Sequence, residues 1–237
     1  DLELASMCNL RCPMCHTVYI RNPSYAAFKK QDTTRLMSFE TFKRAIDEGM
    51  EHKDFSAIKL NFRGESTLHP QIDEFIRYAV GRGVLDILLN SNGNYPVGLN
   101  ERLVDAGLSE IAFSLDALTP ETYKKIRVGG NFYVVMGNVM QMLTYEDRIR
   151  VRVSYVHQKA NAHETEDFTK FWTKMGADKI LISDVYNPAE LMKRDVSVKK
   201  YASPDKFTCP QLWQRLMVLN NGDVYPCCHV FEEPDDL

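Results

Sequence analysis

The chain has 237 residues, of which 44% are hydrophobic and 26% charged, and its formal net charge is −3. This length and balance suit one large α/β domain, alone or with a small appendix. The slight acidic excess gives no reason to expect nucleic acid or an anionic membrane as a partner, and no apolar run approaches the roughly 18 residues of a membrane-spanning helix. With no visible signal peptide, we expect a cytoplasmic protein.

Short apolar runs alternate with segments of helical periodicity along most of the chain. The predicted strands are Leu2–Ser6, Ala57–Phe62, Asp86–Asn90, Glu110–Leu115, Arg150–Val156 and Lys179–Ser183. The predicted helices are 38–52, capped by Ser38, then Gln71–Val80, Leu99–Ala106, Pro120–Ile126, Val134–Leu143 and Thr165–Met175. Gly81 and Gly83 are expected to stop the helix that starts at Gln71.

Strands that alternate with helices favour parallel pairing through right-handed crossovers. Six such units are too few for a closed eight-stranded barrel, so we predict a partial (β/α)6 barrel over residues 1–183. Residues 184–208 are polar and indicate a linker. In the last region, 209–237, Leu216–Leu219 and Val224-Tyr225 flank an Asn-Asn-Gly-Asp turn and predict a small β-hairpin.

The six cysteines form two groups at opposite ends of the chain. Cys8, Cys12 and Cys15 follow the first predicted strand with C-x3-C-x2-C spacing, on one short loop. Three thiolates can hold three irons of a 4Fe–4S cubane and leave the fourth iron open for a ligand. A zinc site completed by His16 is the alternative, although zinc ligands usually come as paired motifs; a disulfide framework is more typical of small secreted domains.

The segment CNLRCPMC resembles the cluster-binding signature of radical S-adenosylmethionine (radical SAM) enzymes. The resemblance implies that the open iron binds SAM and that one electron from the cluster releases a 5′-deoxyadenosyl radical. It also implies an electron donor such as flavodoxin or ferredoxin. Met14 stands where many members carry an aromatic residue near the adenine, and a thioether can also pack on a ring.

Polar segments follow four further strands, at the edge where barrels of this type place active sites. Gly64-Glu65 resembles part of the family's Gly-Gly-Glu motif, with Arg63 replacing its first glycine, and implies that Glu65 meets the SAM amino group. The other implied SAM-binding residues are Ser91 and Asn92, Ser114 in Ser-Leu-Asp-Ala, Arg127 and Asn161. Plain turn and capping roles remain open for these segments.

Cys209, Gly222 and Cys227 resemble the opening of the SPASM or twitch extension, which binds auxiliary 4Fe–4S clusters. The resemblance makes Cys209 and Cys227 expected ligands of a second cluster, whose other ligands lie further downstream in relatives. Cys228 has three open roles: a buried thiol, a further ligand, or a hydrogen donor to a substrate radical.

These residues predict a radical enzyme that abstracts hydrogen from a carbon of a sugar-like, aminocyclitol-like or peptide substrate, for oxidation or epimerisation. The second hypothesis is a non-catalytic iron–sulfur or zinc binding module.

Overall fold

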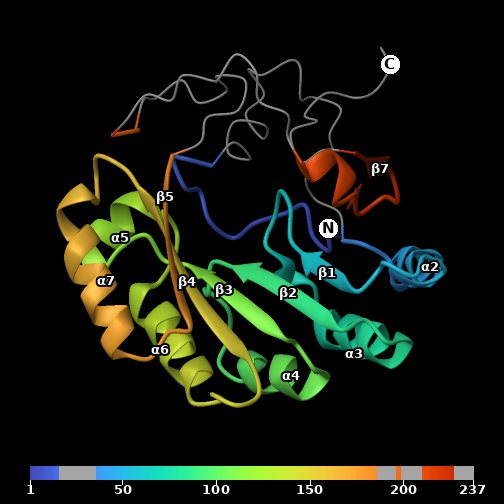
Figure 1. Cartoon of the computed structure of the whole chain (residues 1–237). Helices are drawn as coiled ribbons and strands as arrows, with labels where there is room; N and C mark the ends of the chain where they lie inside the picture. The colour runs from blue at the N-terminus through green and yellow to red at the C-terminus, as the bar shows by residue number, and fades with distance from the viewer. Residues whose placement is uncertain (16–35, 186–195, 199–209, 227–237) are drawn as a thin grey trace, which may run out of the picture.

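The computed structural model describes residues 1–15, 36–185, 196–198 and 210–226. Its centre is a parallel sheet with strand order β1-β2-β3-β4-β5, drawn in Figure 1. The strands are β1 (Ala57–Leu60), β2 (Asp86–Ser91), β3 (Glu110–Ser114), β4 (Arg150–His157) and β5 (Lys179–Asp184). The predicted fold class, a partial α/β barrel with parallel strands and a small hairpin, is confirmed.

The first predicted strand is present only as isolated bridges. Leu2 pairs in parallel with Leu60 of β1, and Ala5 pairs with Leu36. The N-terminal segment therefore extends the sheet beyond β1 and brings the residues that follow it to the carboxyl ends of the strands. Figure 1 shows this blue segment crossing the upper edge of the sheet.

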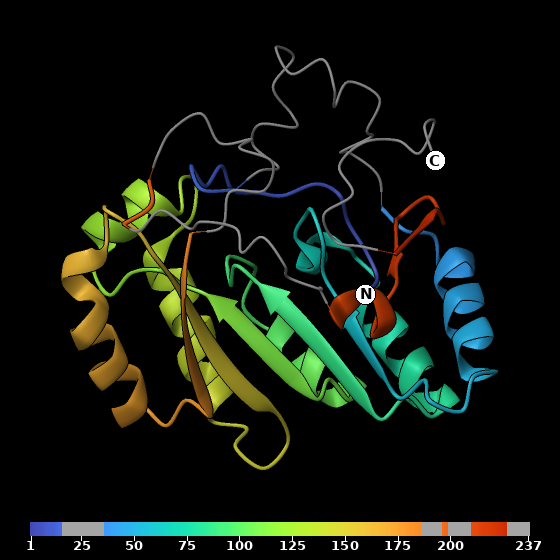
Figure 2. The same cartoon turned by 45° about the horizontal axis from the view of Figure 1, so that its top comes forward.

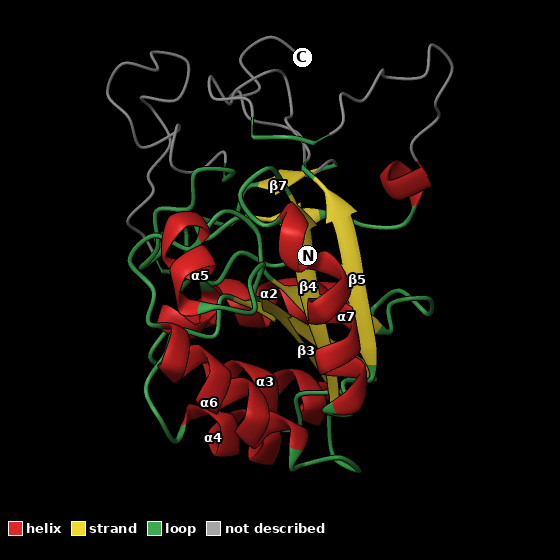
Figure 3. Ribbon diagram, turned by 90° about the vertical axis from the view of Figure 1, so that its left-hand side faces the viewer, coloured by secondary structure: helices red, strands yellow, loops and turns green. Residues whose placement is uncertain are grey.

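Helices cover one face of the sheet, as Figures 2 and 3 show. They are α2 (Phe39–Met50), α3 (Ile72–Arg82), α4 (Leu99–Ala106), α5 (Pro120–Ile126), α6 (Phe132–Leu143) and α7 (Thr165–Lys174). The core between the layers takes alternate strand residues, among them Leu60, Leu89, Phe113 and Val153. Among the described residues, no helix longer than one turn packs on the opposite face.

Local capping explains where the helices begin and end. Ser38 accepts a hydrogen bond from the Thr41 amide and starts α2 as predicted. Helix α3 runs through Gly81 and ends at Gly83, which adopts φ 95°, so Gly81 was wrongly expected to stop it. Helix α6 begins before the predicted Val134 because the Asn131 side chain caps the Tyr133 and Val134 amides.

A small antiparallel hairpin, β6 (Met217–Val218) and β7 (Val224–Tyr225), lies beside the N-terminus. The Val218 amide donates to Asp1 O, and the Glu3 amide donates to Val218 O. The hairpin thus continues the N-terminal edge of the sheet, although the division into residues 1–183, 184–208 and 209–237 stays a prediction. No helix in the described part of the chain is long and apolar enough to span a bilayer.

Candidate active site

The three N-terminal cysteines lie on the loop that leaves the first bridged segment. Cys12 is buried, Cys8 and Cys15 are half-buried, and all three are free thiols. The Cys15 amide donates to Cys12 O, which tightens the turn between them. Burial, opposed by the charge of Arg127, raises the pKa of the Cys12 thiol to about 11. Metal ligation by this residue must therefore displace a proton.

The donor set of the loop is three thiols, the ligand type that holds the irons of a 4Fe–4S cluster. Two of the sulfurs already face N–H donors: Asn92 Nδ2 lies 3.8 Å from Cys8 Sγ, and Arg127 Nη1 lies 3.7 Å from Cys12 Sγ. Such donors stabilise thiolate and tune cluster potentials.

Glu65 lies next to this loop and is buried. It stands at the end of the turn of residues 61–65 that follows β1, which we call the β1 turn. Its Oε1 accepts hydrogen bonds from Thr67 N, Thr67 Oγ1 and Ser91 Oγ, and its Oε2 accepts from Asn92 N at 2.7 Å. Burial raises the pKa of Glu65, while the four donors lower it. Asn92 also donates to Asn9 Oδ1 at 2.8 Å, so the loop after β2 holds both the carboxylate and the cysteine loop.

Gly64 allows the cysteine segment to pass over the β1 turn. A Cβ at this position would lie 2.1 Å from Ala5 O and 2.5 Å from Met7 O, both rigid backbone atoms. The Glu65 amide donates to the same Met7 O at 2.8 Å. Only glycine permits this approach, so Gly64 lets the two backbone segments pack directly against each other.

We expect Gly64→Ala to destabilise the fold by about 1–3 kcal/mol or more, because the added methyl meets backbone that cannot rotate away. Urea unfolding measures this, together with iron retained after reconstitution. Gly81→Ala is the matched control: nothing lies within 4 Å of its added Cβ, so a gain of about 0.5–1 kcal/mol is expected inside α3. Equal stability of the two variants would contradict the assigned packing.

A buried ion pair contacts the cysteine loop at Cys12. Arg127, the C-cap of α5, places Nη2 2.5 Å from Asp116 Oδ2. Asp116 has φ 61° and is fully buried, and its Oδ1 accepts from Val156 N at 2.7 Å. Burial raises the pKa of Asp116, and the guanidinium opposes that rise. Arg127 Nε is buried and has no hydrogen-bond partner in the described part of the chain, which leaves a donor for a ligand carboxylate.

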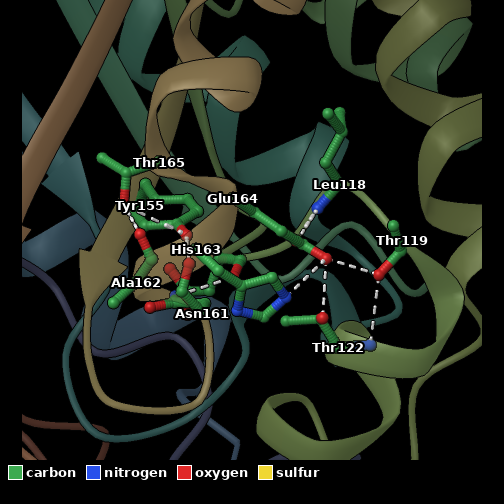
Figure 4. Close-up of polar contacts among 10 residues, drawn as sticks. Leu118, Thr119, Thr122, Tyr155, Asn161, Ala162, His163, Glu164 and Thr165 are labelled. Carbon is green, nitrogen blue, oxygen red and sulfur yellow. Dashed lines mark hydrogen bonds and ion pairs between the residues drawn. The ribbon is translucent and has the colours of Figure 1, made fainter.

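The loop after β4 holds the loop after β3, as Figure 4 shows. Glu164 Oε2 accepts from Leu118 N at 2.7 Å, and Oε1 accepts from Thr119 Oγ1 at 2.5 Å and Thr122 Oγ1 at 2.6 Å. Burial raises the pKa of Glu164, but these donors outweigh it and leave the pKa below its ordinary value. Glu164 therefore anchors the start of α5, the helix whose other end carries Arg127.

Asn161, a predicted SAM-binding residue, is wholly engaged by backbone in this structure. Its Nδ2 donates to Asp116 O at 2.8 Å and Val156 O at 2.9 Å, and its Oδ1 accepts from Gln158 N. Its carbonyl also accepts from Tyr155 OH (Figure 4). These contacts hold Asp116 in its left-handed conformation. A direct contact of Asn161 with SAM stays a prediction.

The remaining predicted site residues are placed as follows. Ser91 Oγ binds Glu65 and the Gly93 amide, and Ser114 is half-buried at the end of β3 beside Ser154. Cys209, Cys227 and Cys228 lie outside the described residues, so an auxiliary cluster and the three roles of Cys228 stay predictions.

Arg63, which replaces a glycine of the family motif, forms a second buried pair. Its Nε and Nη2 each lie 2.7 Å from a carboxylate oxygen of Glu3, and both residues are buried. This two-pronged pair ties the N-terminal segment to the β1 turn. Sequence reasoning missed Glu3 and Glu164, and only their charge within apolar or capping segments could have drawn attention to them.

Comparison with known proteins identifies the family but not the substrate. The Radical SAM superfamily profile matches residues 2–170. A probable GTP 3′,8-cyclase of Methanococcus maripaludis is 24% identical over 92% of this chain and 70% of its own length. A GTP 3′,8-cyclase of Desulforamulus reducens is 28% identical over 71% of this chain and 50% of its own length. The chain thus spans between half and 70% of these two curated relatives.

Solved structures share the fold at low identity. SuiB of Streptococcus suis, bound to precursor peptide SuiA, gives TM-score 0.72 at 14% identity, covering 95% of this chain and 58% of that one. BtrN in complex with AdoMet and 2-DOIA gives TM-score 0.58 at 16% identity, covering 97% and 72%. With the cysteine loop, Glu65 and the Asp116–Arg127 pair gathered at one sheet edge, the chain belongs to the radical SAM superfamily.

Proposed function

We propose that this protein cleaves SAM reductively at a 4Fe–4S cluster held by Cys8, Cys12 and Cys15, and abstracts hydrogen from a carbon of a small polar substrate. When bound, the cluster supplies one electron that breaks a C–S bond of SAM and yields the 5′-deoxyadenosyl radical. The observation that carries the proposal is that the thiol loop contacts both a buried guanidinium, Arg127, and the Asn92 that holds a buried carboxylate, Glu65.

The chain's own residues would bind the two charged groups of SAM. Glu65 supports this role with the lone pair left on Oε2, and Arg127 supports it with the unpartnered Nε. Opposite charges beside the same loop suit an amino acid's ammonium and carboxylate: the Glu65 carboxylate is linked to Cys8 through Asn92, and the guanidinium contacts Cys12. Thr67, Ser91 and Asn92 hold the Glu65 carboxylate in place before any ligand arrives.

Glu65→Gln is expected to weaken SAM binding about tenfold to a hundredfold, because a charge-assisted hydrogen bond contributes about 1.5–3 kcal/mol. Equilibrium binding of SAM to the reconstituted, unreduced protein measures the loss, and iron content should not change. The amide would also set an N–H against one of the present donors and cost some stability.

Thr67→Val is the matched control for that cost. It removes one donor to Glu65 Oε1 but keeps the carboxylate charge, so it should lower the melting temperature while SAM affinity stays within about threefold of wild type. Unchanged SAM affinity in Glu65→Gln would place the ammonium site elsewhere.

The substrate proposal favours a sugar-like or aminocyclitol-like molecule, with oxidation or epimerisation as the outcome. The fold shared with BtrN is consistent with this class, and the fold shared with SuiB is consistent with the alternative, a peptide. GTP is a third candidate because curated relatives are named GTP 3′,8-cyclases. A flavodoxin or ferredoxin as electron donor, an auxiliary cluster at Cys209 and Cys227, and Cys228 as hydrogen donor remain part of the proposal.

The test is anaerobic reconstitution followed by incubation with SAM and a strong reductant. The proposal requires 5′-deoxyadenosine that depends on both SAM and reductant. A protein that holds iron and sulfide but forms none is a non-catalytic cluster-binding module, and uptake of zinc alone would mean that the thiol loop is a zinc site.

A further inference from the structure

The face of the sheet that is turned away from the helices carries a transverse row of polar side chains. Leu89 pairs with both Leu60 and Ile111 in the sheet, and these three residues face the helices as part of the core. The residues that follow them, Asn61, Asn90 and Ala112, therefore point to the opposite face. The register continues this row through Arg152 of β4 to Lys179 of β5.

Three polar atoms in this row are buried and have no hydrogen-bond partner among the residues that the structure describes. They are Asn61 Oδ1, Asn90 Oδ1 and Arg152 Nε. Buried polar atoms nearly always have partners in native proteins, and leaving each one unpaired costs about 1–3 kcal/mol. Three such atoms in one row indicate that the row binds the polar groups of a ligand. An amide can also turn its N–H₂ inward, so each Asn offers either an acceptor or donors.

The row lies close to the cofactor edge. Ser114 and Ser154 pair with each other two residues beyond Ala112 and Arg152, towards the carboxyl ends of the strands. Two residues of a strand span roughly 7 Å. Ala112, in the middle of the row between Asn90 and Arg152, has the smallest side chain of the five. A molecule bound by the row would thus lie about two residues from the strand end that carries Ser114, a predicted SAM-binding residue.

The charge of the row does not suit a polyanion. Arg152 Nη2 lies 3.2 Å from Glu110 Oε1, so its charge is already matched, and Asn61 and Asn90 are neutral. Arg150, on the same face, pairs with Asp86 at 2.8 Å. Lys179, at the outer end of the row, is exposed to solvent. A triphosphate carries several negative charges, and against them the row sets Lys179 and an Arg152 whose charge Glu110 already balances.

We propose that Asn61, Asn90 and Arg152 recognise the substrate, and that they select a compact hydroxylated ring, such as a sugar, amino sugar or cyclitol, over a nucleoside triphosphate. The two amides take hydroxyl or amine groups at one end of the ring, and Arg152 Nε donates to an oxygen at the other end. The inference rests on the proposed radical reaction for its purpose, but the binding itself is independent of SAM cleavage.

The test is equilibrium binding of D-glucosamine and of GTP to the reconstituted, SAM-loaded and unreduced protein. D-glucosamine is expected to bind more tightly than GTP. Arg152→Lys keeps a cation beside Glu110 but removes the planar donor, and should weaken D-glucosamine binding about tenfold or more. Asn90→Ala should weaken it about threefold to tenfold.

Arg150→Ala is the matched control, because it removes an arginine of the same strand and a second contact to Glu110 without touching the row. It should change D-glucosamine binding less than about twofold. Tighter binding of GTP, no binding of D-glucosamine, or equal losses in Arg152→Lys and Arg150→Ala would each overturn the inference. 5′-Deoxyadenosine formed without substrate should persist in Arg150→Ala; its absence from wild type would instead count against the proposed reaction.

Discussion

Replacing Cys8, Cys12 and Cys15 together with alanine is expected to abolish SAM cleavage. The thiolate is the iron ligand, and the loop offers no carboxylate or histidine among its described residues to replace it. Iron and sulfide should fall by one cluster's worth after anaerobic reconstitution, and 5′-deoxyadenosine should fall to the level of a reaction without protein. Iron that remains bound would report on Cys209 and Cys227.

Folding of the triple variant is expected to survive, because the bridges that fix the N-terminal segment use backbone atoms of Leu2 and Ala5 and not the thiols. Met14→Leu is the matched control: it alters the same loop, keeps all three sulfurs, and should retain the full iron content. Formation of 5′-deoxyadenosine by the triple variant would show that the cluster lies elsewhere.

Much of the fold was accessible from the sequence, because its signals are local. Helix α5 begins and ends as predicted, since Thr119 caps it and Pro120 occupies the first helical position. Helix α4 also has its predicted bounds, because Gly107 adopts the left-handed conformation and ends the helix. The predicted N-terminal strand forms only isolated bridges, to one residue of β1, to Leu36 and to the distant hairpin. Pairing over such distances leaves no local pattern in the sequence.

The site could be predicted only in part, for the same reason. The motif residues come together because consecutive parallel strands end at one edge, which follows from the order of elements. The supporting contacts join residues far apart in the sequence. Glu3 meets Arg63 across 60 positions, and Glu164 meets Thr119 across 45. A single sequence contains no periodicity that links such partners, so Arg63 looked like a departure from the family motif rather than half of a buried pair.

Arg127→Leu is expected to cost about 3–5 kcal/mol of unfolding free energy. Removing one member of a buried pair leaves the other charge without compensation, and Asp116 is fully buried while the Arg127 side chain is only 11% exposed. The leucine would also remove the contact of Nη1 with Cys12 Sγ. Urea unfolding of the metal-free protein measures the loss without any contribution from the cluster.

The double variant Asp116→Asn/Arg127→Leu separates charge from packing. With both charges removed, the amide oxygen of the introduced asparagine can still accept a hydrogen bond from the Val156 amide, so a large share of the stability lost in Arg127→Leu should return. SAM affinity should stay low in both variants, because neither offers a guanidinium to a carboxylate. An Arg127→Leu variant within about 1 kcal/mol of wild type would mean that Asp116 takes up a proton once the guanidinium is gone. In that case the guanidinium would be retained for the ligand alone, since the fold would not depend on its charge.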